Sequence, residues 1–306
     1  MTPETAVTAL SGATRWMAYV GGVLAVGACG FRFAVLTAVR RCEGSGQFHR
    51  RASQIGLGGA MLFFVASLSR IYVQTYVFFG SEQTITVDLL RTVVFQTRWG
   101  SGWMWQFAAS AACVVAYLAI LRSPRLGWPA AILTGLAICA TSPLTGHAMS
   151  HVVPWQAVSL QALHLAGSGL WLGTLVIVFS VIVWPPTDGE ARPLIQEPTV
   201  VVNAFSRVAL AGCGLLVVTG CLTTWLYIDE MTVLWTTAYG QTLLTKLGLF
   251  LAVASLGAYN WRRLKPHLGS PSKTASLLRS VAAELVLAGI VLAVTAFLVG
   301  LPLLAQ

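Results

Sequence analysis

Apolar runs long enough to cross a bilayer recur along this sequence and limit what the chain can fold into. A helix needs about 20 predominantly apolar residues to span the hydrocarbon core. Eight such helices are expected, with approximate bounds 16–39, 54–79, 102–121, 130–147, 155–184, 205–228, 237–261 and 277–304. Charged residues make up only 9% of the chain, against about 25% in soluble domains. The sequence therefore predicts an all-α, polytopic membrane protein, a bundle of about eight transmembrane helices in a single domain over residues 1–306.

The basic residues are distributed unequally between the two sets of connecting loops. The loops after the first, third, fifth and seventh expected helices carry Arg40, Arg41, Arg50, Arg51, Arg122, Arg125, Arg192, Arg262, Arg263, Lys265 and Lys273. The opposite side carries Arg15, Arg91 and Arg98. Because Lys and Arg mark cytoplasmic loops, both termini are expected outside, in the periplasm of a Gram-negative bacterium. The positive charge is then explained by topology and membrane lipids, with no nucleic acid as a partner.

Between the second and third expected helices, a polar stretch has apolar residues at helical spacing. They are Val87, Leu90, Val94 and Phe95. This pattern predicts a helix that lies along the outer membrane surface.

The six cysteines form no CxxC motif, and five lie inside apolar runs. This distribution indicates small packing residues and argues against a disulfide framework or a zinc site.

Residues 142–173 hold three of the five histidines, His147, His151 and His164, together with Met149. Imidazole and thioether donors suit copper, and the thioether favours Cu(I) over zinc, although two histidines fit Cu(I) or Cu(II). If the fourth helix continues through residues 147–151, which we call the HAMSH segment, His147 and His151 share one face. If the helix ends earlier, an H-x-M-x-H loop can still wrap one ion. His164 lies about two turns inside the next helix, and a tight turn would bring it near His147.

These residues predict a metal site near the outer face, most readily for copper. The alternative is that His147 and His151 are interfacial polar residues and that His164 hydrogen-bonds a backbone carbonyl. A histidine inside a membrane span is costly to place there, which favours a functional role.

Small residues surround His164 in its helix. Gly169 and Gly173 form a close-approach face for another helix, and Gly167 and Trp171 are three and seven residues past His164. A glycine-lined space beside a histidine suits an ion path, and it equally suits plain helix packing.

Four charged residues lie inside apolar spans: Arg32, Arg70, Lys246 and Glu284. Because an unpaired charge in a membrane is unfavourable, we expect Glu284 to pair with Lys246, with Arg32 or Arg70 as alternative partners. Such a pair serves either structural specificity or a transport pathway.

No Walker motif, dinucleotide fingerprint, nucleophile elbow or HExxH motif is present. The sequence therefore indicates neither ATP-driven pumping by this chain alone nor an enzyme.

Three segments of the second half resemble the CopD family of bacterial inner-membrane copper resistance and transport proteins. They are LHLAGSGLWLGTL, FSRVALAGCGLLVVTG and TAYGQTLLTKLGLFLAVASLGAYNWRRLKP. The matching positions are His164, Trp171, Tyr239, Gly240, Leu244, Lys246, Asn260, Arg262, Arg279 and Glu284. The resemblance covers a CopD-like core at about residues 142–305, and the first half fits in length and span count more than in motif.

The resemblance implies copper handling at the inner membrane, often beside a small periplasmic copper-binding protein of the CopC type. His147 and His164 stand where the family also has histidine, whereas Met149 and His151 are proposed from their chemistry alone. The direction of copper movement and the choice between transport and delivery to another protein stay open.

A haem b-binding electron-transfer protein is the alternative from another functional class. Histidines inside membrane spans, with aromatic neighbours, are the axial ligands that such a haem needs. His147 and His164 would then be those ligands.

Overall fold

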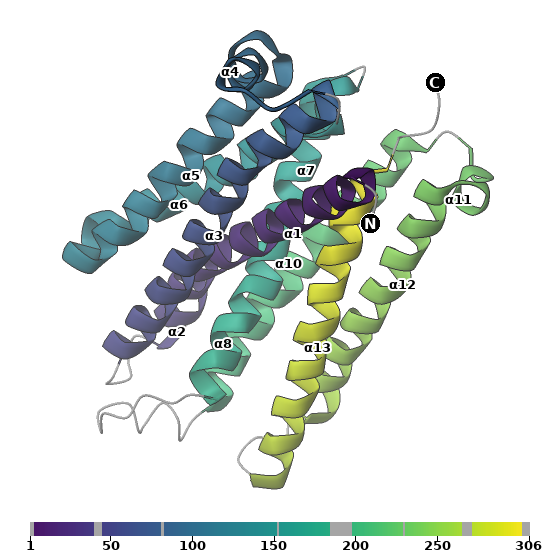
Figure 1. Cartoon of the computed structure of the whole chain (residues 1–306). Coiled ribbons are helices and arrows are strands. Elements are labelled where there is room, and N and C mark those ends of the chain that lie inside the picture. The colour runs from purple at the N-terminus through teal and green to yellow at the C-terminus, as the bar shows by residue number, and fades with distance from the viewer. Residues whose placement is uncertain are drawn as a thin grey trace.

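The computed structural model describes residues 3–39, 45–80, 83–151, 153–183, 198–228, 230–264 and 271–301, and every regular element in these ranges is helical. Within them, eight helices are long and apolar enough to cross a membrane, which confirms the predicted number of spans (Figure 1). These are residues Val7–Val35, Phe48–Phe79, Arg98–Arg122, Pro124–Thr145, Pro154–Val183, Val201–Tyr227, Ala238–Arg263 and Ala275–Leu298.

The first four spans pack against one another. Their elements are α1 (Pro3–Gly30), η1 (Phe31–Val35), α2 (Leu36–Val39), α3 (Ser45–Phe79), α5 (Arg98–Arg122) and α6 (Pro124–Thr141). Helix α1 packs along α3, α3 along α5, and α5 along α6. Tyr117 and Trp128 are the largest side chains that are completely buried in this group. Their rings meet edge to face with centroids 6.2 Å apart, so they fill the space between α5 and α6.

The last four spans are arranged around the α7–α8 helix. Their elements are α7 (Pro154–Ser168), η4 (Gly169–Gly173), α8 (Thr174–Val183), α10 (Pro198–Tyr227), α11 (Val233–Thr236), α12 (Ala238–Tyr259), η6 (Asn260–Leu264) and α13 (Pro271–Leu298). Helices α7 and α8 pack between α1 and α10. Helices α12 and α13 form an antiparallel pair (Figure 1), in which α13 contacts α1 and α8 and α12 contacts η4.

The glycines near the middle of α7–α8 serve helix packing. A Cβ added at Gly169 would lie 2.5 Å from the Cβ of Val26 on α1, and one at Gly167 would lie 3.0 Å from the Gly212 carbonyl oxygen on α10. Gly173 faces α1 in the same way, against Val23. Small residues allow membrane helices to approach this closely, so the predicted close-approach face is confirmed. The π-helical turn η4 widens the helix at this point.

Several helix bounds differ from the expected ones. The first helix begins at Pro3, well before Trp16, and proline is well accommodated in the first turn of a helix. The fourth runs over Pro124–Thr141 in place of 130–147. Pro124 suits the first helical turn, and Pro143 cannot donate the next backbone hydrogen bond. The expected ends at Trp184 and Leu304 lie outside the described residues.

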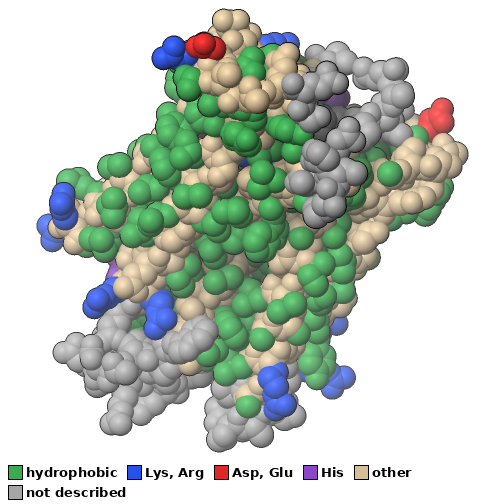
Figure 2. All heavy atoms as spheres, viewed as in Figure 1, with side chains coloured by type: hydrophobic (Ala, Val, Ile, Leu, Met, Phe, Trp, Pro, Cys, Tyr) green, Lys and Arg blue, Asp and Glu red, His purple; other side chains and the backbone are tan. Residues whose placement is uncertain are grey.

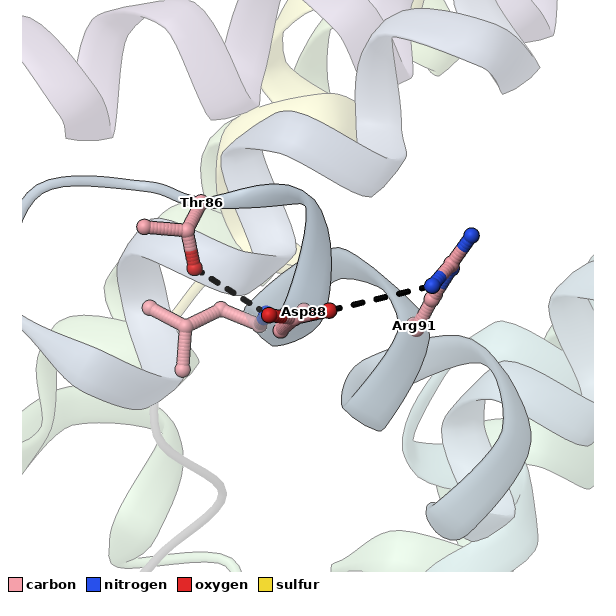
Figure 3. A network of polar contacts seen from close by, with 4 residues as sticks. Thr86, Asp88 and Arg91 are labelled. Atoms are coloured by element: carbon pink, nitrogen blue, oxygen red, sulfur yellow. Dashed lines mark hydrogen bonds and ion pairs between the residues drawn. The ribbon is translucent and has the colours of Figure 1, made fainter.

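Helix α4 (Val87–Gln96) forms where the sequence predicts an amphipathic helix. The Thr86 hydroxyl accepts a hydrogen bond from the backbone N–H of Leu89 at 3.4 Å, and Arg91 pairs with Asp88 at 3.8 Å (Figure 3). Val93 and Val94 are buried, whereas Val87 and Phe95 are exposed. The helix is confirmed, and its position along a membrane surface stays a prediction.

The two ends of the bundle differ in charge. One end carries α4, α11 and the N-terminus, and we call it the α4/α11 end (Figure 1). The other end, which we call the basic end, includes η6 with Arg262 and Arg263. On the face shown in Figure 2, the acidic side chains lie at the α4/α11 end, where basic side chains also occur, and further Lys and Arg side chains lie towards the basic end.

Candidate functional site

The HAMSH segment folds as a turn at the α4/α11 end. After α6, two 3₁₀ turns follow, η2 (Ser142–Thr145) and η3 (His147–Ser150), with Gly146 extended between them. His151 is also extended, with φ −71° and ψ 152°. The fourth helix therefore does not continue through His147 and His151, and the alternative in which they share one helical face does not hold. The H-x-M-x-H loop is the arrangement that the structure supports.

Arg70 of α3 anchors this turn. Its guanidinium group donates to the Thr145 hydroxyl at 2.8 Å and to the Thr145 carbonyl oxygen at 3.2 Å. The Trp99 indole donates to the same carbonyl at 3.2 Å, and Thr145 donates to the Gln106 side chain at 3.3 Å. Thr145 and Gln106 are buried. Residues from α3 and α5 therefore hold the backbone immediately before His147.

The histidines of the turn are described to different extents. The side chain of His147 lies outside the described part of the structure, and Met149 is half-buried. His151 accepts a hydrogen bond from the Val153 N–H through Nδ1 at 3.1 Å. Its ring meets Tyr227 of α10 edge to face, with centroids 5.4 Å apart. His151 therefore lies at the junction of the turn, α7 and α10.

His164 lies deeper, where α7 faces α10. It is half-buried, and Nδ1 is 2.9 Å from the Thr219 hydroxyl oxygen. Gly220 lies beside the ring, and a Cβ added there would be in ordinary van der Waals contact with the imidazole Cε1, at 3.6 Å. His164 is ten residues into α7, about 15 Å along the helix axis at 1.5 Å per residue. The alternative in which His164 hydrogen-bonds a backbone carbonyl does not hold, because the partner of Nδ1 is the Thr219 side chain.

The Thr219 contact determines which ring nitrogen of His164 is free. The Thr219 hydroxyl has one proton, and it lies 2.6 Å from the Leu215 carbonyl oxygen, which can only accept. The Thr219 oxygen must then accept from His164 Nδ1–H. The lone pair of the neutral imidazole is consequently on Nε2, which makes no hydrogen bond within the described residues. A histidine held through one nitrogen by a second residue is the usual arrangement of a metal ligand.

Lys246 of α12 is close enough to His164 for its charge to act on the ring. It is half-buried and forms no ion pair with Glu284. Lys246 and Asn260, which contacts Glu284, are 14 residues apart on α12–η6, or about 21 Å along the axis. The expected Lys246–Glu284 pair is therefore wrong because the two side chains lie at different depths.

Glu284 instead accepts a hydrogen bond from the Asn260 side-chain amide at 3.0 Å. Neither Arg32 nor Arg70 replaces Lys246 as its ion-pair partner. Arg32 is in η1, with its guanidinium carbon 5.4 Å from the Phe33 ring centroid and 5.9 Å from that of Trp128. The four intramembrane charges thus occupy separate surroundings and do not form one charge-paired pathway.

No group of three His, Cys, Asp or Glu residues that could hold a metal occurs among the described residues. The described cysteines are all free, and Cys42 is outside the described residues. The donors at the α4/α11 end are therefore Met149, His151 and His164, carried by a turn and the helix that follows it.

Two family models match the chain. The model described as copper resistance protein D matches residues 199–298, and the model of the copper resistance protein D-like N-terminal domain matches residues 6–157. The chain belongs to the copper resistance protein D (CopD) family. The second match extends the likeness to the first half, where the sequence motifs do not reveal it.

A curated relative of this CopD-family chain is the copper transport protein CutJ of Bacillus subtilis. The two are 28% identical over 226 residues, which cover 71% of this chain and 40% of the relative. The chain thus matches about two fifths of the length of that relative. No solved structure matches the chain.

The structure shows what several of the residues that match the CopD motifs contact. Trp171 is buried against Phe250, with ring centroids 5.8 Å apart, and links η4 to α12. Gly240 allows the α11 turn to approach α12, because an added Cβ would be 2.5 Å from the Leu234 Cα. Tyr239 packs in the small apolar cluster beside α11. These three residues are packing residues, whereas Asn260 contacts a buried carboxyl group.

Sequence reasoning missed Thr219 and Gln106. Each is one of several polar residues in a mostly apolar helix, and nothing in the sequence identifies its partner.

Proposed function

We propose that this CopD-family protein binds copper at its α4/α11 end and moves it across the bacterial inner membrane, or accepts it there from a carrier, as part of copper homeostasis. One observation carries the proposal: Thr219 holds His164 so that Nε2 faces away with its lone pair free. A second ligand set, in the HAMSH turn, lies at the same end of the bundle. Imidazole and thioether groups together suit copper.

The charge distribution supports an orientation in which the α4/α11 end faces outside. Lys and Arg concentrate in cytoplasmic loops, and the basic end includes Arg262 and Arg263. Both termini would then be periplasmic, and copper would meet Met149 and His151 before His164. A soluble copper-binding protein of the CopC type is the partner that this orientation suits.

Metal analysis of the purified protein tests the copper site. We expect copper bound by the wild type after expression with added copper, and a loss of that copper in His164→Ala. His49→Ala is the matched control, because His49 lies in α3 and packs beside Trp128. Equal copper content in wild type and His164→Ala would refute the assignment. A Soret band in the same samples would assign the histidines to haem instead.

Proteoliposomes separate transport from delivery. Copper flux that is present with wild type and lost with His164→Ala supports movement across the membrane. Copper binding without flux supports delivery to another protein.

A further inference from the structure

Glu284 is a carboxyl group inside the bundle that has no counter-ion among the described residues. It lies on α13, its side chain is 3% exposed, and no Lys, Arg or His within the described residues forms an ion pair with it. Its polar contact is the Asn260 amide nitrogen at 3.0 Å. A charged carboxylate in a membrane interior is costly unless it is paired and fully hydrogen-bonded. One amide donor does not meet that requirement.

Asn260 is also incompletely satisfied. Its side chain is 7% exposed, and its Oδ1 is buried without a hydrogen-bond partner among the described residues. Unsatisfied buried acceptors are uncommon and need an explanation. This orphaned oxygen belongs to the same amide group that donates to Glu284.

A proton on Glu284 would correct both deficits. The amide of Asn260 offers donors and an acceptor, and a neutral carboxylic acid offers one donor and one acceptor. An ionised carboxylate only accepts hydrogen bonds, so it cannot donate to the Asn260 Oδ1, which then stays without a donor. The two side chains are thus complementary when Glu284 is protonated.

The packing around the carboxyl group leaves space for it, and the described part of the chain supplies no cation there. Gly257 of α12 faces Glu284, since a Cβ there would be 3.2 Å from Oε1. On α10, Cys213 is the titratable group within electrostatic range. On η6 and α13, Arg262, Arg263 and Arg279 are exposed and form no ion pair with Glu284. Helix α8 has no titratable residue. Arg15 of α1 and Arg32 of η1 form no ion pair with Glu284 either.

We propose that Glu284 and Asn260 form a proton-binding site within the membrane, through which a proton gradient acts on this protein. Binding adds one proton to the carboxylate, and release returns that proton to water, with no electron transfer. The site lies towards the basic end, whereas His164 lies towards the α4/α11 end. The coupling to copper movement rests on the function proposed above, but the proton site itself does not.

Infrared spectroscopy of the purified protein over a pH series tests the proton site. We expect the C=O stretching band of a protonated carboxylic acid that disappears as the pH rises, is absent from Glu284→Gln, and is shifted in Asn260→Leu. Glu230→Gln is the control, because Glu230 is an exposed carboxylate in the loop before α11. Glu284→Asp provides a second variant whose band should move in frequency. Identical carboxylic-acid regions in wild type and Glu284→Gln would overturn the proposal.

Copper flux in proteoliposomes tests the coupling. A pH gradient should change the initial flux of the wild type and leave that of Glu284→Gln unchanged, while both retain the same copper content at the His164 site. An equal response of both proteins to the gradient would overturn the coupling. If the wild type contained no copper, the copper function would be refuted, whereas the infrared result would still decide whether Glu284 binds a proton.

Discussion

The guanidinium group of Arg70 holds both the hydroxyl and the carbonyl oxygen of Thr145, at 2.8 and 3.2 Å. This clamp joins α3 to the turn that carries the copper-binding candidates. A hydrogen bond to a charged group contributes about 1.5–3 kcal/mol, and the clamp contains two such bonds to one residue. Arg70 is consequently best described as a residue that positions the HAMSH turn.

Arg70→Gln should lower the stability of the protein by about 2–3 kcal/mol and weaken copper binding at the turn. The loss follows because Gln lacks the forked donor group that reaches both oxygens of Thr145. Thermal unfolding in detergent and a copper titration measure the two effects. Arg91→Gln is the control, because Arg91 forms an exposed pair with Asp88. A copper affinity unchanged in Arg70→Gln would show that the clamp does not position the ligands.

Thr219→Val should weaken copper binding by about 10–100-fold, the usual effect of removing a residue that orients a metal ligand. Valine matches threonine in shape but leaves the Nδ1–H of His164 without an acceptor. Thr219→Ser keeps the hydroxyl and should bind copper as the wild type does. Competition with a chelator of known copper affinity gives the copper dissociation constants of the three proteins. If Thr219→Val and Thr219→Ser bound copper with equal affinity, Thr219 would have no role in the copper site.

Lys246→Met should strengthen copper binding at His164 by about tenfold, which corresponds to about 1.4 kcal/mol. The positive charge of Lys246 acts on the ring and opposes a second cation there, and methionine has a similar length without the charge. Lys246→Arg keeps the charge and should retain the wild-type affinity. A chelator titration of the three proteins measures the difference. Weaker binding in Lys246→Met would indicate that Lys246 supports the site in some other way.

The number of membrane spans follows from the sequence because each span needs an apolar run of known length. The position of His164 was also predictable, since a histidine is conspicuous in such a run. The contacts between helices were not, because they depend on how far each helix is rotated and shifted against its neighbours. The incorrect pairing of Lys246 with Glu284 has this origin: both lie within spans, but at different depths.

The HAMSH segment shows a second limit of sequence reasoning. The apolar run before it ends at about Ala140, yet the fourth helix was expected to reach His147. The helix ends at Thr141 because of a local feature, the proline at position 143. The partners of the turn are in α3 and α5, far away in sequence, and no local pattern identifies them.

The contact between α1 and η4 gives a prediction about stability alone. Gly27 faces Gly173 and Thr174, and a Cβ at Gly27 would lie 2.7 Å from the Thr174 backbone nitrogen. Because the obstructing atoms belong to the backbone, Gly27→Ala must separate the helices and should destabilise the protein by about 1–3 kcal/mol.

Gly214→Ala is the matched control, because nothing lies within 4 Å of an added Cβ there. Alanine favours a helix over glycine by about 0.5–1 kcal/mol, so this variant should be as stable as the wild type or more stable. Thermal unfolding of both variants in detergent measures the difference. If Gly27→Ala were as stable as Gly214→Ala, α1 and η4 would not pack as closely as the glycines imply, and the position of the α7–α8 helix against α1 would have to be revised.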